Sequence, residues 1–123
     1  MITFEVGDIG DMNAGLWRFV KYLEGSGVDA DAVFDSRLVS CELITNVLRH
    51  CGGSALFSGI FSDGEITITV CASSPTGEII SVPDLPEVLA ESGRGLYIVN
   101  ALSGGNVKIT GGNVTVKISA RKR

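Results

Sequence analysis

The sequence predicts an α/β sandwich, in which one layer of helices covers a mixed, mostly antiparallel sheet. Two observations predict this class. Helical patterns alternate with pairs of strand-like runs, and each pair is joined by a short turn that contains glycine. The 123 residues are 45% hydrophobic and 20% charged, which is typical of a globular protein with its own core. No linker or internal repeat divides them, so we expect one domain over residues 1–123.

The first half of the chain predicts an edge strand, two long helices and a β-hairpin. The first helix follows a capping side chain, Asp11 or Asn13, and ends at a glycine-rich turn. We expect Trp17 and Tyr22 on this helix to pack against the fold rather than form a ligand cage. The hairpin turn is expected at residues 62–64. The expected elements are the strand 2–6, the first helix to about 23, the second helix 29–49 and the hairpin strands 55–61 and 65–71.

The second half predicts two further helices and a second hairpin. A short helix is expected over residues 84–90, because Asp84 can cap it and Pro86 sits early in it. An apolar-periodic run predicts a helix over residues 95–102. A Gly-Gly turn at residues 111–112 joins the final strands, 106–110 and 113–120.

Three polar residues on the second predicted helix, Glu42, Asn46 and His50, form one strip. Their spacing is i, i+4, i+8, so they drift only about 80° around the helix. His50 falls inside the apolar arc of this helix, and Asn46 lies at its edge. An amide and an imidazole turned toward a core need a polar partner, and a bound ligand is one. The alternative is an ordinary solvated face whose edge dips into the core.

A second motif lies at residues 91–102, where Gly93, Arg94 and Gly95 precede an apolar helical run. Glycine has no Cβ, so the backbone N–H groups of this turn stay open, and the following helix adds its own unpaired N–H groups. Together they suit an anion such as phosphate. The alternative is a plain loop-to-helix junction. The sequence contains neither a P-loop nor a dinucleotide-binding fingerprint.

The two motifs together resemble the anti-sigma factor serine kinases, small members of the GHKL ATP-binding superfamily. Residues 42–50 match the N-box of that family, Glu-x-x-x-Asn-x-x-x-His, and residues 92–99 match its second glycine box. A predicted hairpin lies between the motifs, and the closing Gly-Gly hairpin fits the last two strands of the family. The resemblance covers nearly the whole chain. It implies a Bergerat-type, two-layer α/β sandwich with the helices on one face of the sheet.

The resemblance also implies roles for particular residues. Glu42 would be the general base, and Asn46 would hold Mg²⁺. Gly93, Arg94, Gly95 and Leu96 would hold the phosphates of ATP, while His50 would support the helix from behind the site. Such proteins bind a sigma factor and phosphorylate a serine on an antagonist protein. We therefore expect these two partners, no direct contact with nucleic acid and no membrane. A homodimer stays open.

One residue departs from the family pattern. Ala72 stands where the family has the aspartate that accepts a hydrogen bond from the adenine amino group. Loss of that acceptor should cost roughly 1–3 kcal/mol of nucleotide binding. The segment between Pro75 and Ser92 is also a short lid. Both features favour an alternative to a kinase, a binding module that keeps the fold and partner surface without catalysis. A nucleotide hydrolase of the same superfamily is a further alternative.

Charge and cysteine usage narrow the class of protein further. All 14 acidic residues lie in residues 1–92, while residues 93–123 carry only basic charges, so the C-terminal part favours an anionic ligand or is simply solvated. Three bases at the end are too few to predict nucleic-acid binding without aromatic stacking residues. No run approaches membrane-spanning length, and residues 1–5 do not resemble a signal peptide.

Cysteine number and spacing predict a reducing, cytoplasmic environment. The three residues Cys41, Cys51 and Cys71 are odd in number and lack a Cys-x-x-Cys spacing, so we expect reduced, mostly buried thiols. A zinc site that combined Cys41 with His50 is disfavoured, because the two lie about 180° apart around the predicted helix.

Overall fold

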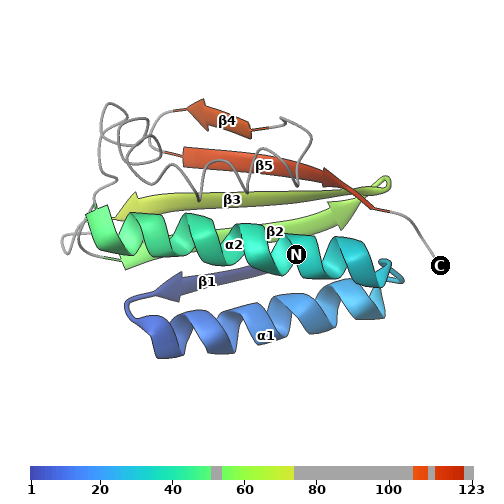
Figure 1. The fold of residues 1–123 in the computed structure, drawn as a ribbon, viewed down its shortest axis with the longest axis horizontal. Helices are drawn as coiled ribbons and strands as arrows, with labels where there is room; N and C mark the ends of the chain where they lie inside the picture. The colour runs from blue at the N-terminus through green and yellow to red at the C-terminus, as the bar shows by residue number, and fades with distance from the viewer. Residues whose placement is uncertain (51–53, 74–106, 111–112, 121–123) are drawn as a thin grey trace.

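Two helices and five strands make up the part of the chain that the computed structural model describes, residues 1–50, 54–73, 107–110 and 113–120. The strands form one sheet in the order β1-β2-β3-β5-β4, and both helices lie on the same face of it (Figure 1). The α/β class is therefore confirmed for these residues. The elements are β1 (Ile2–Val6), α1 (Ile9–Gly25), α2 (Ala30–His50), β2 (Ser54–Ser62), β3 (Glu65–Ser73), β4 (Val107–Thr110) and β5 (Asn113–Ser119).

All four strand pairings in the described sheet are antiparallel, where the sequence predicted a mixed, mostly antiparallel sheet. The β2–β3 pair is a hairpin, and a tight turn can join only antiparallel neighbours. The helices predicted over residues 84–90 and 95–102 lie outside the described residues.

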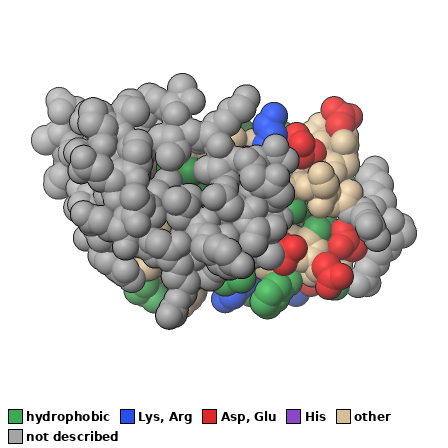
Figure 2. All heavy atoms as spheres, turned by 45° about the horizontal axis from the view of Figure 1, so that its top comes forward, with side chains coloured by type: hydrophobic (Ala, Val, Ile, Leu, Met, Phe, Trp, Pro, Cys, Tyr) green, Lys and Arg blue, Asp and Glu red, His purple; other side chains and the backbone are tan. Residues whose placement is uncertain are grey.

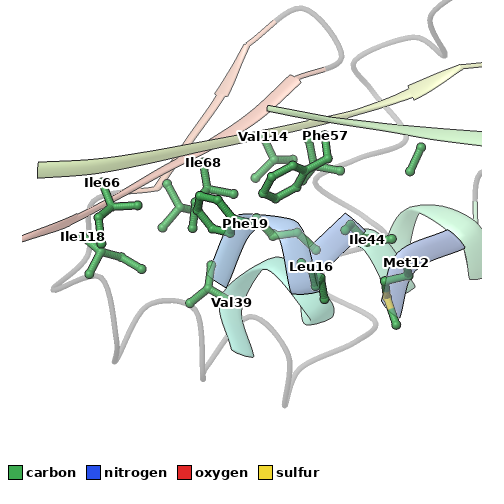
Figure 3. Close-up of a cluster of buried hydrophobic side chains, with 14 of the residues drawn as sticks. Met12, Leu16, Phe19, Val39, Ile44, Phe57, Ile66, Ile68, Val114 and Ile118 are labelled. Atoms are coloured by element: carbon green, nitrogen blue, oxygen red, sulfur yellow. The ribbon is translucent and has the colours of Figure 1, made fainter. Parts of the chain in front are cut away.

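One face of the sheet is buried and the other is partly open. Alternate residues of β2, β3 and β5 point toward the helices, and Figure 3 shows Phe57, Ile68 and Val114 directed at side chains of α1 and α2. Between them, residues such as Thr67 and Thr69 face the other way and are half-buried. This period-two alternation matches the pattern that predicted the strands.

Helix α1 begins earlier than the sequence predicted. Its N-cap is Asp8, whose Oδ1 accepts a hydrogen bond from the backbone N of Asp11 at 2.8 Å. Asp11 reaches back, and its Oδ2 accepts from the N of Gly7 at 3.0 Å. The prediction of Asp11 or Asn13 as the cap is therefore wrong, because this reciprocal pair satisfies the first backbone donors one turn sooner. The predicted turn after α1 is confirmed, with Gly27 at a φ of 83°.

Helix α2 and the following hairpin begin and end close to their predicted limits. The side chain of Asp29 accepts from the N of Ala32 at 3.1 Å, so the helix starts at Ala30. The hairpin turn has two residues rather than the predicted three. Asp63 and Gly64 have φ values of 54° and 74°, and the positive φ at both positions is what a type I′ turn requires. The twist of a type I′ turn matches the right-handed twist of β2 and β3, so the two strands pair up to the turn itself.

Helix α1 lies very close to β1 and β2 because two glycines leave room for phenylalanine rings. A Cβ on Gly15 would overlap the ring of Phe4, and a Cβ on Gly59 would overlap the ring of Phe19. The rings of Phe4 and Phe57 stack with centroids 4.5 Å apart, and Phe19 meets Phe57 edge-on at 5.1 Å. This aromatic group anchors α1 to the sheet.

We expect Gly59→Ala to destabilise the protein by about 1–3 kcal/mol, because the added methyl group would displace the buried ring of Phe19. Gly25→Ala is the matched control, since a Cβ at Gly25 has no neighbour within 4 Å and alanine favours a helix end as well as glycine or better. Urea unfolding of both variants measures the difference. Equal stability of the two variants would show that α1 does not need this close approach.

Candidate functional site

Helix α2 carries the predicted polar strip at the edge of its buried face. Asn46 is 3% exposed, between the buried Leu43 and Val47, whereas Glu42 one turn earlier is half-buried. The prediction that Asn46 lies at the edge of the apolar arc is confirmed. The His50 side chain lies outside the described residues. The burial of Asn46 fits both expectations, a ligand-binding strip and a solvated face whose edge dips into the core.

The residue that departs from the family pattern lies at the same end of the molecule. Figure 1 places the last residues of β3 and the C-terminal end of α2 together at the left. Ala72 is fully buried on the helix-facing side of β3, and it pairs with the equally buried Ala55 of β2. Two methyl groups therefore occupy this part of the sheet. Neither can accept a hydrogen bond.

Helix α1 and the sheet together position the strip. Helix α2 packs on β3, β2 and β5, and it also lies against α1. At that contact the hydroxyl of Thr45 lies 3.9 Å from the sulfur of Met12. Because α2 contacts both the sheet and α1, the positions of Glu42 and Asn46 are fixed relative to the buried end of β3.

Among the described residues, Asn46 suits the Mg²⁺ of a bound nucleotide, but the carboxylate that reads adenine in the family is missing. The amide oxygen of Asn46 is a hard ligand of the kind that Mg²⁺ prefers. No group of three or more His, Cys, Asp or Glu side chains within the described ranges could hold a metal ion by itself. For adenine the fit fails at Ala72, whose methyl group cannot replace a carboxylate. Gly93, Arg94, Gly95 and Leu96, predicted to hold phosphates, lie outside the described residues.

The cysteines take no part in this arrangement where the structure describes them. Cys41 and Cys71 are free thiols and half-buried, rather than mostly buried as predicted. Burial raises the pKa of the Cys71 thiol, so it is a poor nucleophile at neutral pH. Cys51 lies outside the described residues.

Neither described helix is long and apolar enough to cross a membrane.

Two large aromatic side chains stand out on the helical layer. Trp17 is 63% exposed and Phe34 is 65% exposed, so the prediction that Trp17 packs in the fold is wrong. Trp17 follows the buried Leu16 by one residue, and this turns it about 100° away from the core-facing side of α1. Tyr22 does pack: its ring stacks with Phe19, and its hydroxyl accepts a hydrogen bond from the N of Phe61 at 3.1 Å.

Sequence reasoning did not single out Phe34. The sequence did contain a sign that its ring would be exposed, because Phe34 lies off the apolar stripe of its helix.

Neither a scan against protein-family models nor a search of the curated proteins finds a match to this chain. Its own residues and the resemblance of its two motifs to a known family are therefore what points to a function.

Two buried serines on the core-facing side of α2 differ in one respect that can be tested. The hydroxyl of Ser40 donates to the carbonyl of Ser36 at 2.7 Å, whereas the buried hydroxyl of Ser36 has no hydrogen-bonding partner in the structure. A buried hydroxyl without a hydrogen-bonding partner lowers the free energy of unfolding, so removing that hydroxyl should raise the free energy again.

We expect Ser36→Ala to be more stable than Ser40→Ala by about 1 kcal/mol. Both substitutions gain the same helix propensity, so their difference isolates the hydrogen bond. Chemical denaturation of the two variants beside the parent protein gives the values. If Ser36→Ala were the less stable of the two, the Ser36 hydroxyl would have a partner in solution.

Proposed function

We propose that this protein is an anti-sigma regulatory factor of bacterial partner switching, built on a Bergerat-type α/β sandwich. In this role it binds a sigma factor and an antagonist protein in the cytoplasm. The observation that carries the proposal is the burial of Asn46 one turn after the half-buried Glu42, within a stretch that matches the N-box. The layer of helices on one face of the sheet is compatible with that fold.

The residues of the strip suit different tasks. Glu42 keeps part of its carboxylate accessible, so a serine hydroxyl of the antagonist can approach and give up its proton there. Asn46 is buried and would supply its amide oxygen to Mg²⁺. The backbone N–H groups of Gly93, Arg94, Gly95 and Leu96 would hold phosphate. Bound ATP would supply the phosphoryl group.

A second candidate function is a binding module that holds its partners without phosphorylating them. The buried methyl group of Ala72 favours it, because the strongest adenine contact of the family is missing. A protein freed from catalysis would still keep its partner surface. We therefore expect measurable partner binding and slow or absent phosphotransfer.

The role of Ala72 can be tested by restoring the carboxylate. We expect Ala72→Asp to tighten ATP binding roughly 5- to 150-fold, the equivalent of about 1–3 kcal/mol, because the carboxylate would accept a hydrogen bond from adenine. Calorimetry with Mg²⁺ on both forms gives the dissociation constants.

Ala55→Asp is the matched control, since Ala55 lies directly opposite Ala72 across the β2–β3 pair and is equally buried. A carboxylate there should lower stability without improving ATP binding. Tight binding of ATP by the parent protein would show that another group reads adenine.

The proposed function itself is tested against the sigma factor and antagonist encoded nearby. Interferometry with and without Mg-ATP measures partner binding, and a phosphotransfer assay on the antagonist measures catalysis. Any transfer should be lost in Glu42→Gln with nucleotide binding nearly intact, because a base acts on the attacking hydroxyl. Asn46→Ala should instead weaken Mg²⁺–nucleotide binding.

Rapid phosphorylation of the antagonist would exclude the binding module and establish the kinase. Failure to bind either partner would refute the partner-switching role. Equal loss of binding and stability in both variants would make the strip purely structural.

A further inference from the structure

The helix-facing side of the sheet is apolar at the end of β3, where the family resemblance implies contact with adenine. Ala72 and Ala55 lie opposite each other across the β2–β3 pair, and both are 0% exposed. The next pair on the same side, Phe57 with Val70, is also buried. These four side chains can neither donate nor accept a hydrogen bond, so they cannot distinguish one base from another by its polar edge.

Asn46 is the buried polar side chain of α2 that lies closest to this end of the sheet. Among the described residues, the buried polar side chains are Ser36, Ser40 and Asn46, all on α2. The two serines lie six and ten residues before Asn46, about 9 and 15 Å along the helix. Asn46, by contrast, belongs to the C-terminal end of α2, which Figure 1 places beside the last residues of β3.

Other carboxylates at this end of the molecule are engaged or directed elsewhere. Glu5 is exposed on the opposite face of the sheet, because the residues on either side of it along β1 pack into the core. Asp8 and Asp11 are exposed and accept hydrogen bonds from nearby backbone N–H groups. Glu42 lies on α2 one turn before Asn46, further from the end of β3. In Figure 2 the Asp and Glu side chains in view gather toward the right-hand half, whereas Figure 1 places the end of β3 at the left. None of these carboxylates therefore replaces the one missing at residue 72.

Purine bases differ at position 6 in the kind of hydrogen bond that they offer. Adenine carries an amino group there, which donates, whereas guanine and hypoxanthine carry an oxygen, which accepts. An ionised carboxylate only accepts, so it favours adenine and repels the oxygen of the other two bases. The amide of Asn46 both donates and accepts, and the methyl group of Ala72 does neither. Neither side chain therefore selects adenine.

Selection between two bases requires a polar group of the protein that one of the bases leaves unpaired. A site built to hydrogen-bond a substrate rejects an analogue that lacks the matching group, because buried polar atoms of the protein then have no partner. An apolar pocket has no such atoms, so it rejects the analogue only weakly. Beside Ala72, the amino group of adenine and the oxygen of guanine would each lose a hydrogen bond to water, and the two losses are similar.

We propose that the nucleotide site of this chain does not select adenine and binds purine nucleoside triphosphates with either an amino group or an oxygen at position 6. This proposal rests on the proposed function, because it names the substrate class of the same site. Affinity then comes from the triphosphate and its Mg²⁺, which all these nucleotides share, rather than from the polar edge of the base.

ATP and inosine triphosphate (ITP) are the matched pair of probes. Hypoxanthine, the base of ITP, has nearly the size of adenine and carries an oxygen in place of the amino group, so the pair differs mainly at the edge in question. Calorimetry on the full chain with Mg²⁺ gives both dissociation constants. We expect the parent protein to bind ATP and ITP within about threefold of each other, and GTP to compete with both.

Two substitutions of the same shape at residue 72 test whether this position reads the base. Ala72→Asp should bind ATP at least about tenfold tighter than ITP, because the carboxylate accepts from the amino group and repels the oxygen. Ala72→Asn should bind both within about threefold, because an amide accepts from one base and donates to the other. Urea unfolding shows whether each variant is folded, and the affinities of the parent protein test the proposal without any substitution.

A parent protein that bound ATP at least about tenfold tighter than ITP would overturn the proposal, because another group would then read the base. Binding of neither nucleotide would overturn it too. So would a folded Ala72→Asp variant without a preference for ATP, or an equal preference in Ala72→Asn, which would make side-chain size the cause. The partner-switching role is judged separately, by binding to the sigma factor and the antagonist, so either proposal can fail while the other stands.

Discussion

The close approach of α1 to the sheet is the constraint on which the rest of the structure depends. Gly15 and Gly59 lack side chains at the points where Phe4 and Phe19 press on them, so the rings can interlock with Phe57. This seats α1 over β1 and β2. Helix α2 then lies beside α1 on the same face, over the central strands, and its polar edge takes up a fixed place above the end of β3. A larger residue at either glycine would move both helices.

Helix α2 carries two regions with different chemistry at its two ends. Its C-terminal half holds Glu42 and Asn46 beside the buried end of β3, and its N-terminal half lines a groove beside α1 through Val33, Phe34 and Arg37. Phe34 and Asn46 are separated by about 18 Å along a single helix. Molecules bound at the two regions would therefore touch different residues.

Much of the described fold could be predicted from the sequence, because its elements have strong periodicity and clear turn residues. The strand 2–6, both helices and the hairpin appear within a few residues of their expected limits. One error in the fold concerns a choice between nearby polar side chains. Asp8 and Asp11 cap α1 as a reciprocal pair, and the sequence does not say which of several neighbouring acids is extended enough to do so. For the site, the burial of Asn46 followed from helical spacing, whereas the glycine box lies outside the described residues.

The sequence by itself determined most of the secondary structure of the described residues, the polar strip on α2 and the absence of a carboxylate at residue 72. These depend on local periodicity and on the chemistry of single side chains. Only the tertiary structure decided which exposed residues lie together. Glu24 and Phe34 lie on different helices and line one groove because the helices fold back on each other. It also decided that Ala72 is buried on the helix-facing side, since burial depends on which face of the sheet the helices cover.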